Sequence, residues 1–94
     1  MTEYYIYILT NNYKTLHTGI TTDMRRQFLD HKSKEAPGFT SIFSNIKLVY
    51  LEKAQDIHKA IQRLSQIRTY MPAEQISLIE ASNPNWDDLS SDWS

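Results

Sequence analysis

Aromatic and β-branched side chains alternate at the start of the chain and predict a strand over residues 4–9. Successive side chains of a strand point to opposite faces of its sheet, so Tyr7 belongs to one face while Ile6 and Ile8 belong to the other. Both faces of this segment are apolar. The pattern therefore favours a central strand that is covered by other elements on its two sides.

A hairpin is expected next. Asn11 and Asn12 supply residues that are typical of turns. A second short strand is predicted over residues 16–20 and closes on Gly19, where the missing Cβ permits a close approach of another group to the backbone.

The following polar and apolar spacing predicts a helix. We expect it to begin near Thr22 as its N-cap, with Asp23 in the first turn, where a negative charge suits the helix dipole. Residues three, four and seven positions apart share one side of a helix. The side expected to face the sheet carries Met24, Gln27, Phe28 and His31.

Pro37 interrupts this pattern and predicts a loop that runs to about Asn45. A third strand is predicted over residues 46–51, and two helices over residues 56–70 and 72–81. The first of these two helices carries a stripe that we expect to face inwards, namely Ile57, Ala60, Ile61, Leu64, Ile67 and Arg68.

The end of the chain combines tryptophan with acidic residues. Trp86, Leu89 and Trp93 fall at helical spacing, which predicts one helical turn docked on the body. We therefore expect a single domain over residues 1–94, with a core over residues 1–82 and a docked tail over residues 83–94. The alternative is an aromatic tail that stays free for a protein partner.

Charge is divided unevenly along the chain. Residues 1–70 carry all ten Lys and Arg against six acids, a balance of +4, whereas residues 71–94 carry five acids and no base. A basic body permits contact with phosphates, but the acidic end argues against attraction of nucleic acid to the whole surface. Cysteine is absent, which excludes disulfides and thiolate metal sites and agrees with a cytoplasmic location. The apolar runs are strand-sized, so we expect no membrane partner and no targeting segment.

Six short motifs, in order and at the right spacing, resemble those of the GIY-YIG nuclease superfamily. They are Tyr5-Ile6-Tyr7, His17-Thr18-Gly19, the helical pattern from Thr21 to His31, Lys47-Leu48-Val49-Tyr50, residues 56–61 and residues 83–90. The chain is similar to the small single-domain (URI-type) members of that superfamily. The resemblance implies an α+β fold in which a small three-stranded antiparallel sheet is flanked by helices, in the order β-β-α-β-α-α.

For active members, the resemblance implies a phosphodiester-cleaving site with few groups. These are a tyrosine from each strand motif, an arginine and a His or Tyr on the first helix, and one glutamate on the second helix that holds a divalent metal. Such cleavage needs a positioned water, a base and positive charge, and Mg²⁺ takes oxygen ligands. The corresponding positions of this chain hold Tyr7, His17, Gln27, His31 and, in place of the glutamate, Leu64.

Three of these five positions cannot repeat the usual role unchanged. Leu64 has no ligand atom, Gln27 has no charge, and His17 replaces a tyrosine. Removal of one preorganised electrostatic group typically costs ~3–4 kcal/mol of transition-state stabilisation, or roughly 10²–10³ in rate. We therefore expect no metal cofactor and an impaired catalytic site, that is, a pseudoenzyme.

Each position also has an ordinary structural interpretation. Tyr7 is then a packed strand residue, His31 a pocket histidine and Leu64 part of a continuous apolar stripe. His17 has the side chain of a general base near neutral pH. The basic residues either line a phosphate-facing surface or are solvated helix charges, and they are Arg25, Arg26, Lys32, Lys34, Arg63 and Arg68.

Three functions follow from this sequence. The first is an impaired nuclease-like domain kept as a module that binds DNA or RNA, or as a regulatory module. The second is an active endonuclease that uses Tyr7 and His17, with Mg²⁺ or Mn²⁺ recruited by another acid, namely Asp23, Glu52 or Asp56. The third is a protein-interaction domain that acts through its two tryptophans.

Overall fold

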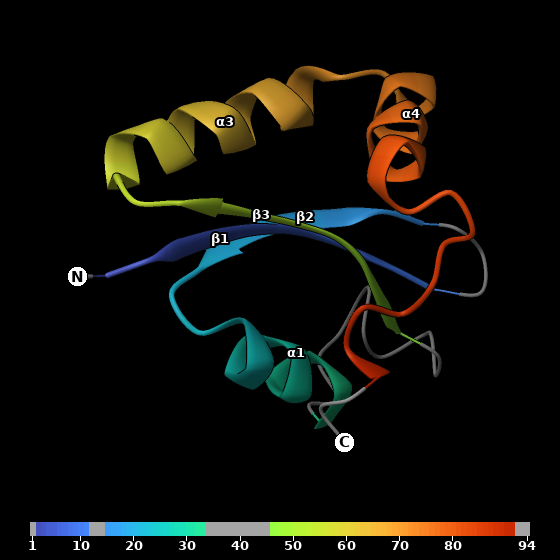
Figure 1. Cartoon of the computed structure of the whole chain (residues 1–94), viewed down its shortest axis with the longest axis horizontal. Helices are drawn as coiled ribbons and strands as arrows, with labels where there is room; N and C mark the ends of the chain where they lie inside the picture. Colours follow the sequence, from blue (N-terminus) through green and yellow to red (C-terminus); the bar gives the residue numbers. More distant parts are fainter. Residues whose placement is uncertain (1, 12–14, 34–45, 92–94) are drawn as a thin grey trace.

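A three-stranded antiparallel sheet forms the middle layer of the molecule (Figure 1). The computed structural model describes residues 2–11, 15–33 and 46–91. Strand β1 (Tyr4–Thr10) is central, with β2 (His17–Thr21) along one edge and β3 (Lys47–Ala54) along the other. The expectation that the first strand is central, with both faces covered, is therefore confirmed.

Helices cover the two faces of this sheet unequally. Helix α1 (Met24–Ser33) lies on one face, whereas α3 (Ile57–Thr69) and α4 (Pro72–Ser82) lie on the other (Figure 1). The described elements follow one another as β1, β2, α1, β3, α3 and α4. The α+β fold with a flanked three-stranded sheet is confirmed, and the ends of its elements differ from the predicted ones by a few residues.

Two hydrophobic cores result, one on each side of the sheet. The α3-side core consists of Ile6, Ile8, Val49, Tyr50, Ala60, Leu64, Ile67 and Ile79. The α1-side core consists of Tyr7, Leu9, Met24, Phe28, Ile46 and Leu48. Burial of one large aliphatic side chain contributes roughly 1.5–3 kcal/mol. A slip of one residue in strand register would exchange the two sets of side chains, so the cores also fix the register.

The start of α1 differs from the prediction. Asp23, not Thr22, caps the helix, because its carboxylate accepts a hydrogen bond from the Arg26 backbone N–H at 3.2 Å. The Asp23 N–H in turn donates to the Thr21 hydroxyl at 3.1 Å. Thr22 is exposed. The tight turn after β2 thus moves the cap one residue along the chain.

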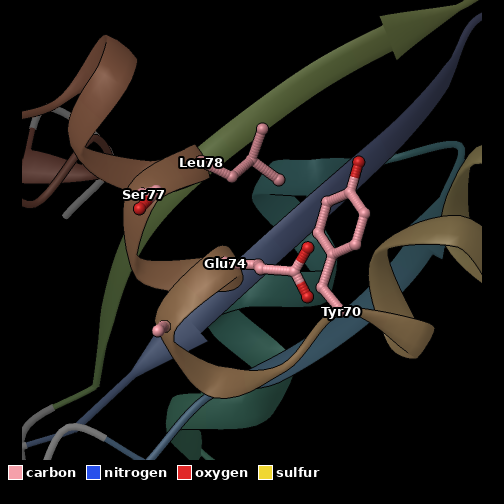
Figure 2. A pocket seen from close by; sticks show the side chains of 5 residues that line it. Tyr70, Glu74, Ser77 and Leu78 are labelled. Atoms are coloured by element: carbon pink, nitrogen blue, oxygen red, sulfur yellow. The ribbon is translucent and has the colours of Figure 1, made fainter.

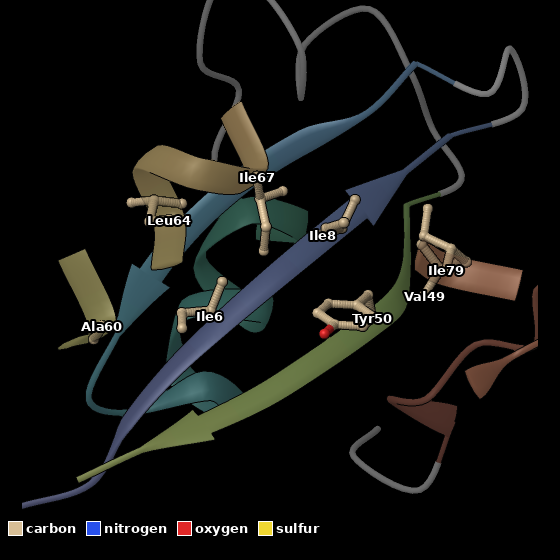
Figure 3. Packing of buried hydrophobic residues seen from close by; sticks show 8 residues of the cluster. All are labelled: Ile6, Ile8, Val49, Tyr50, Ala60, Leu64, Ile67 and Ile79. Atoms are coloured by element: carbon tan, nitrogen blue, oxygen red, sulfur yellow. The ribbon is translucent and has the colours of Figure 1, made fainter. Parts of the chain in front are cut away.

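The inner face of α3 is narrower than the sequence suggested. Ala60, Leu64 and Ile67 are buried against the sheet, as predicted (Figure 3). The predicted inward position is wrong for Arg68, which is exposed, and for Ile57 and Ile61, which are 36% and 50% exposed. A rotation of 100° per residue places both isoleucine side chains on the flank of the buried stripe. The sheet has only three strands and does not extend far enough to cover them.

Residues after α4 are docked on the body, mainly through polar groups. The side-chain amide of the buried Asn83 donates to the Val49 carbonyl at 3.1 Å and to the Asp87 carbonyl at 2.9 Å. The Leu89 N–H donates to the Leu48 carbonyl at 2.7 Å. The predicted docking helical turn is wrong over the described part, because residues 86–88 have no helical structure and the Leu89 side chain is 43% exposed. Trp93 lies outside the described residues.

Over the part of the chain that the structure describes, no helix has both the length and the apolar character needed to cross a membrane.

Candidate functional site

The site is organised by a tyrosine that lies across a glycine. Tyr7 in β1 is paired with Gly19 in β2, and the Tyr7 side chain is only 3% exposed. A Cβ atom built on Gly19 would collide with the phenol ring and hydroxyl of Tyr7. The requirement for glycine at position 19 is therefore steric, since the side chain of any other residue would displace the Tyr7 ring. Because β2 is an edge strand, the crossing carries the Tyr7 hydroxyl out to the edge of the sheet.

Two further predicted positions lie next to this hydroxyl. The Gln27 side-chain amide, from α1, donates a long hydrogen bond of 3.5 Å to the Tyr7 hydroxyl oxygen. The ring of His17, from the start of β2, lies at a centroid distance of 6.3 Å from the Tyr7 ring and is tilted by 46°. Three of the predicted site residues, from three different elements, are thus brought together. His31 belongs to α1, but its side chain lies outside what the structure describes.

The Tyr7 hydroxyl stays protonated in the physiological range. Burial raises the pKa of Tyr7 above its usual value, while the hydrogen bond from Gln27 and the positive charge of Arg68 lower it by less. A neutral phenol can donate a hydrogen bond to a phosphate oxygen. It is a poor base, because its phenolate form is disfavoured.

A basic residue of α3 reaches the same edge from the other side of the sheet. The Arg68 Nε donates to the Thr18 hydroxyl at 3.3 Å, and its Nη2 donates to the Thr18 carbonyl at 3.1 Å. Thr18 immediately precedes Gly19. The sequence listed Arg68 among the basic residues but did not connect it with Tyr7, because only the packing of α3 on the sheet brings the two together.

Leu64 is placed where a divalent metal does not fit. The side chain is 7% exposed and packs with Ile6 and Ile8 in the α3-side core (Figure 3). Tyr7 belongs to the opposite core. Among the residues described, no three His, Cys, Asp or Glu side chains gather into a group able to hold a metal ion. The Mg²⁺ or Mn²⁺ ion that the resemblance implies thus has no oxygen ligand on this helix at the expected position.

The three acids that the endonuclease alternative puts in place of the missing glutamate have structural roles. Asp23 caps α1, and Asp56 caps α3 by accepting from the His58 N–H at 2.8 Å. Glu52 accepts from the Tyr50 hydroxyl at 2.6 Å and forms an ion pair with Arg63 at 3.1 Å. None of the three is an unengaged carboxylate beside Tyr7.

The predicted phosphate-facing cations separate into groups. Arg25 and Arg26 on α1 are exposed. Arg63 is held inside a network, where it donates to both Glu52 oxygens and to Tyr70 and Gln66. Burial alone would lower the pKa of Arg63, but its hydrogen bonds to Glu52 and the tyrosines outweigh burial and raise it. The side chain of Lys32 and the whole of Lys34 lie outside the described residues.

An open pocket of about 490 Å³ lies between the end of α3 and α4 (Figure 2). Its walls are formed by Tyr70, Ala73, Glu74, Ser77 and Leu78. Glu74 is the charged residue of this set, and a carboxylate repels phosphate. The pocket therefore does not extend the Tyr7 site.

Comparison with known proteins identifies a family and a related fold. A family model described as the GIY-YIG catalytic domain matches residues 3–70. A UPF0213 protein of Syntrophus aciditrophicus is 34% identical over 85 residues, which cover 89% of this chain and 97% of that protein. A UPF0213 protein of Natronomonas pharaonis is 29% identical over 77 residues, covering 82% and 91% of the two chains. The fold resembles the solution NMR structure of a UPF0213 protein from Bacillus halodurans, with a TM-score of 0.62, 18% identity and coverage of 95% and 96%.

Proposed function

The chain belongs to the GIY-YIG family and is a relative of the UPF0213 proteins, and on that premise we propose that it binds the phosphodiester backbone of DNA or RNA without hydrolysing it. The observation that carries the proposal is Leu64, which puts hydrocarbon at the position of the family's metal-binding glutamate and packs it into the α3-side core. We place this activity in the cytoplasm, in keeping with a chain that has no cysteine.

Several groups that contact phosphate are nevertheless kept. The neutral hydroxyl of Tyr7 is a hydrogen-bond donor, and Arg25 and Arg26 are exposed cations on the helix that also carries Gln27. Lys and Arg side chains that neutralise phosphates release counterions from nucleic acid, which supplies most of the non-specific affinity. The arrangement supports binding, whereas the substitution of Gln27 for an arginine removes charge that a phosphoryl-transfer transition state needs.

The endonuclease alternative is not favoured. It needs a carboxylate to recruit the metal, and Asp23, Glu52 and Asp56 each hold a cap or an ion pair. Diverting Glu52 to a metal would leave Arg63 without its counter-charge, which costs stability.

A protein-interaction role through the tryptophans receives no support from Trp86. Its indole N–H donates to the Glu80 carboxylate at 2.8 Å, and its half-buried ring packs against the α3-side core. The ring is therefore used to hold the segment after α4 on the body.

The test is to incubate purified protein with single-stranded, duplex and branched DNA and with single-stranded RNA, with Mg²⁺ and separately with Mn²⁺. We expect salt-dependent binding to at least one of these nucleic acids and no cleavage of any. Binding should weaken on the order of 10³-fold between 50 and 200 mM salt if about six phosphates are contacted. Metal-dependent nicking that disappears in Tyr7→Phe would replace this proposal by the endonuclease, and absence of binding to all of them at low salt would refute it.

A further inference from the structure

Arg68 of α3 contacts the edge strand β2, next to the place where the Tyr7 ring lies over Gly19. It lies in the last turn of α3, on the face of the sheet opposite Gln27. Two hydrogen bonds to one residue, Thr18, fix the orientation of its guanidinium group. The backbone of that residue continues directly into Gly19, over which the Tyr7 ring lies. The cation and the phenol thus approach one strand from its two faces.

The charge of Arg68 is not neutralised within the part of the molecule that is described. Its recorded partners, the Thr18 hydroxyl and carbonyl, are both uncharged. Arg63, a little more than one turn earlier on the same helix, is paired with Glu52 instead. Arg68 is also exposed. One cation of α3 is thus engaged inside the fold, and the other is presented to solvent at the edge that carries Tyr7.

We infer that Arg68 binds the phosphate that Tyr7 contacts, and so supplies from α3 the positive charge that Gln27 does not supply from α1. The inference rests on the proposed function and names the centre of its binding surface. Guanidinium groups suit this task because they remain charged and offer several donors in a plane. The influence of the Arg68 charge on the pKa of Tyr7 agrees with this proximity.

Residue 68 follows residue 64 by one helical turn, so both lie on the same flank of α3. A carboxylate at position 64 would therefore stand close to the guanidinium of Arg68 and compete for it. With leucine there, position 64 presents no carboxylate to Arg68. The same substitution that removes the metal ligand thus turns this flank of α3 towards phosphate binding.

The experiment measures the affinity for short fluorescein-labelled single-stranded and duplex DNA as a function of salt, for the wild type, Arg68→Gln, Arg68→Lys and Lys59→Gln. Lys59 is an exposed cation of α3, and its separation of nine positions from Arg68 places the two on opposite sides of the helix. We expect Arg68→Gln to weaken binding roughly 3–10-fold at low salt and to reduce the slope of log affinity against log salt by about one. Lys59→Gln should change neither quantity.

Arg68→Lys separates phosphate binding from a merely structural role. A lysine keeps the charge but cannot make both contacts with Thr18, so a phosphate-binding role predicts that it retains the wild-type salt slope. If Arg68→Lys instead lowers the salt slope as Arg68→Gln does, the role of Arg68 is structural, through its contacts with Thr18, and the inference is overturned. Equal salt slopes for the wild type and Arg68→Gln would overturn this inference but leave the proposed DNA binding intact. If the wild type has no affinity for DNA in this assay, both the inference and the proposed binding of DNA are overturned.

Discussion

The two faces of the sheet have diverged in what they do. On the α3 side, Leu64 completes a continuous apolar core, and the polar side chains at its border, Glu52 and Arg63, neutralise each other. On the α1 side, polar groups remain beside the core, with Gln27 on the Tyr7 hydroxyl and His17 near its ring. The α3-side core is closed by apolar packing, whereas polar groups lie beside Tyr7 at the β2 edge, which Arg68 of α3 also reaches.

Under the proposed function, this difference illustrates how a scaffold can be kept without its catalytic centre. A metal site that draws on both layers fails when either layer loses its ligand. Phosphate binding has a weaker requirement, because it needs donors and positive charge but no fixed coordination geometry. Tyr7, Arg25 and Arg68 supply such donors and charge without a carboxylate at position 64.

Leu64→Glu should produce the largest change in stability, because it places a carboxylate in the α3-side core. We expect the free energy of unfolding to fall by roughly 2–4 kcal/mol, from lost apolar burial and the cost of burying a charge. Urea denaturation followed by circular dichroism measures this change. Ile61→Glu is the matched control on the same helix, and at 50% exposure it should change stability by less than about 0.5 kcal/mol. If Leu64→Glu is as well tolerated as its control, the α3 side is hydrated and the metal-dependent alternative returns.

Gly19→Ala should have the next largest effect, and it tests the α1 side of the sheet, which carries Tyr7. The new methyl group would collide with the Tyr7 phenol, so we expect a loss of roughly 1–3 kcal/mol from overpacking. The same substitution made in a Tyr7→Leu background should cost clearly less, since the ring that it meets is gone. Costs that simply add in the double variant would show that the ring does not lie over Gly19.

Much of the α1 side could be predicted from sequence. The resemblance to the GIY-YIG motifs on two strands and a helix identified Tyr7 and Gln27, which the structure brings together across Gly19. Local patterns suffice there because the hairpin and α1 are consecutive in the chain. The start of α1 was misplaced by one residue, since Thr22 and Asp23 are both acceptable caps and only the turn geometry selects between them.

The α3 side was less predictable, because its contacts are long-range. Arg68 and Thr18 are separated by 50 positions, and no local pattern links them. The apolar Ile57 and Ile61 suggested a wider inner face than a three-stranded sheet can cover. After α4, the spacing of Trp86 and Leu89 suggested a helix, whereas residues 86–88 are not helical and the segment is held by the Asn83 side chain and the β3 backbone.

Arg63→Gln distinguishes the cation used inside the fold from the one that faces solvent. We expect it to lower the free energy of unfolding by roughly 0.5–1 kcal/mol, because the pair with Glu52 is partly exposed and screened by solvent. The salt slope of DNA binding should remain that of the wild type. A slope reduced by about one would show that Arg63 contacts phosphate and would return it to the binding surface.

The smallest effect is confined to alkaline pH and compares one tyrosine from each face. Burial raises the pKa of both Tyr7 and Tyr50 above the value of about 10 expected in the unfolded chain. The stabilisation that each neutral hydroxyl gives is complete below pH 10, because the unfolded chain then also holds the proton. Above that pH the unfolded state loses its proton first, so stability falls as pH rises towards the folded pKa, by at most about 1.4 kcal/mol per pH unit for each tyrosine. Tyr7→Phe and Tyr50→Phe should each make this fall shallower in urea titrations across the alkaline range, and a slope that neither variant alters would show that both hydroxyls titrate as they do in the unfolded chain.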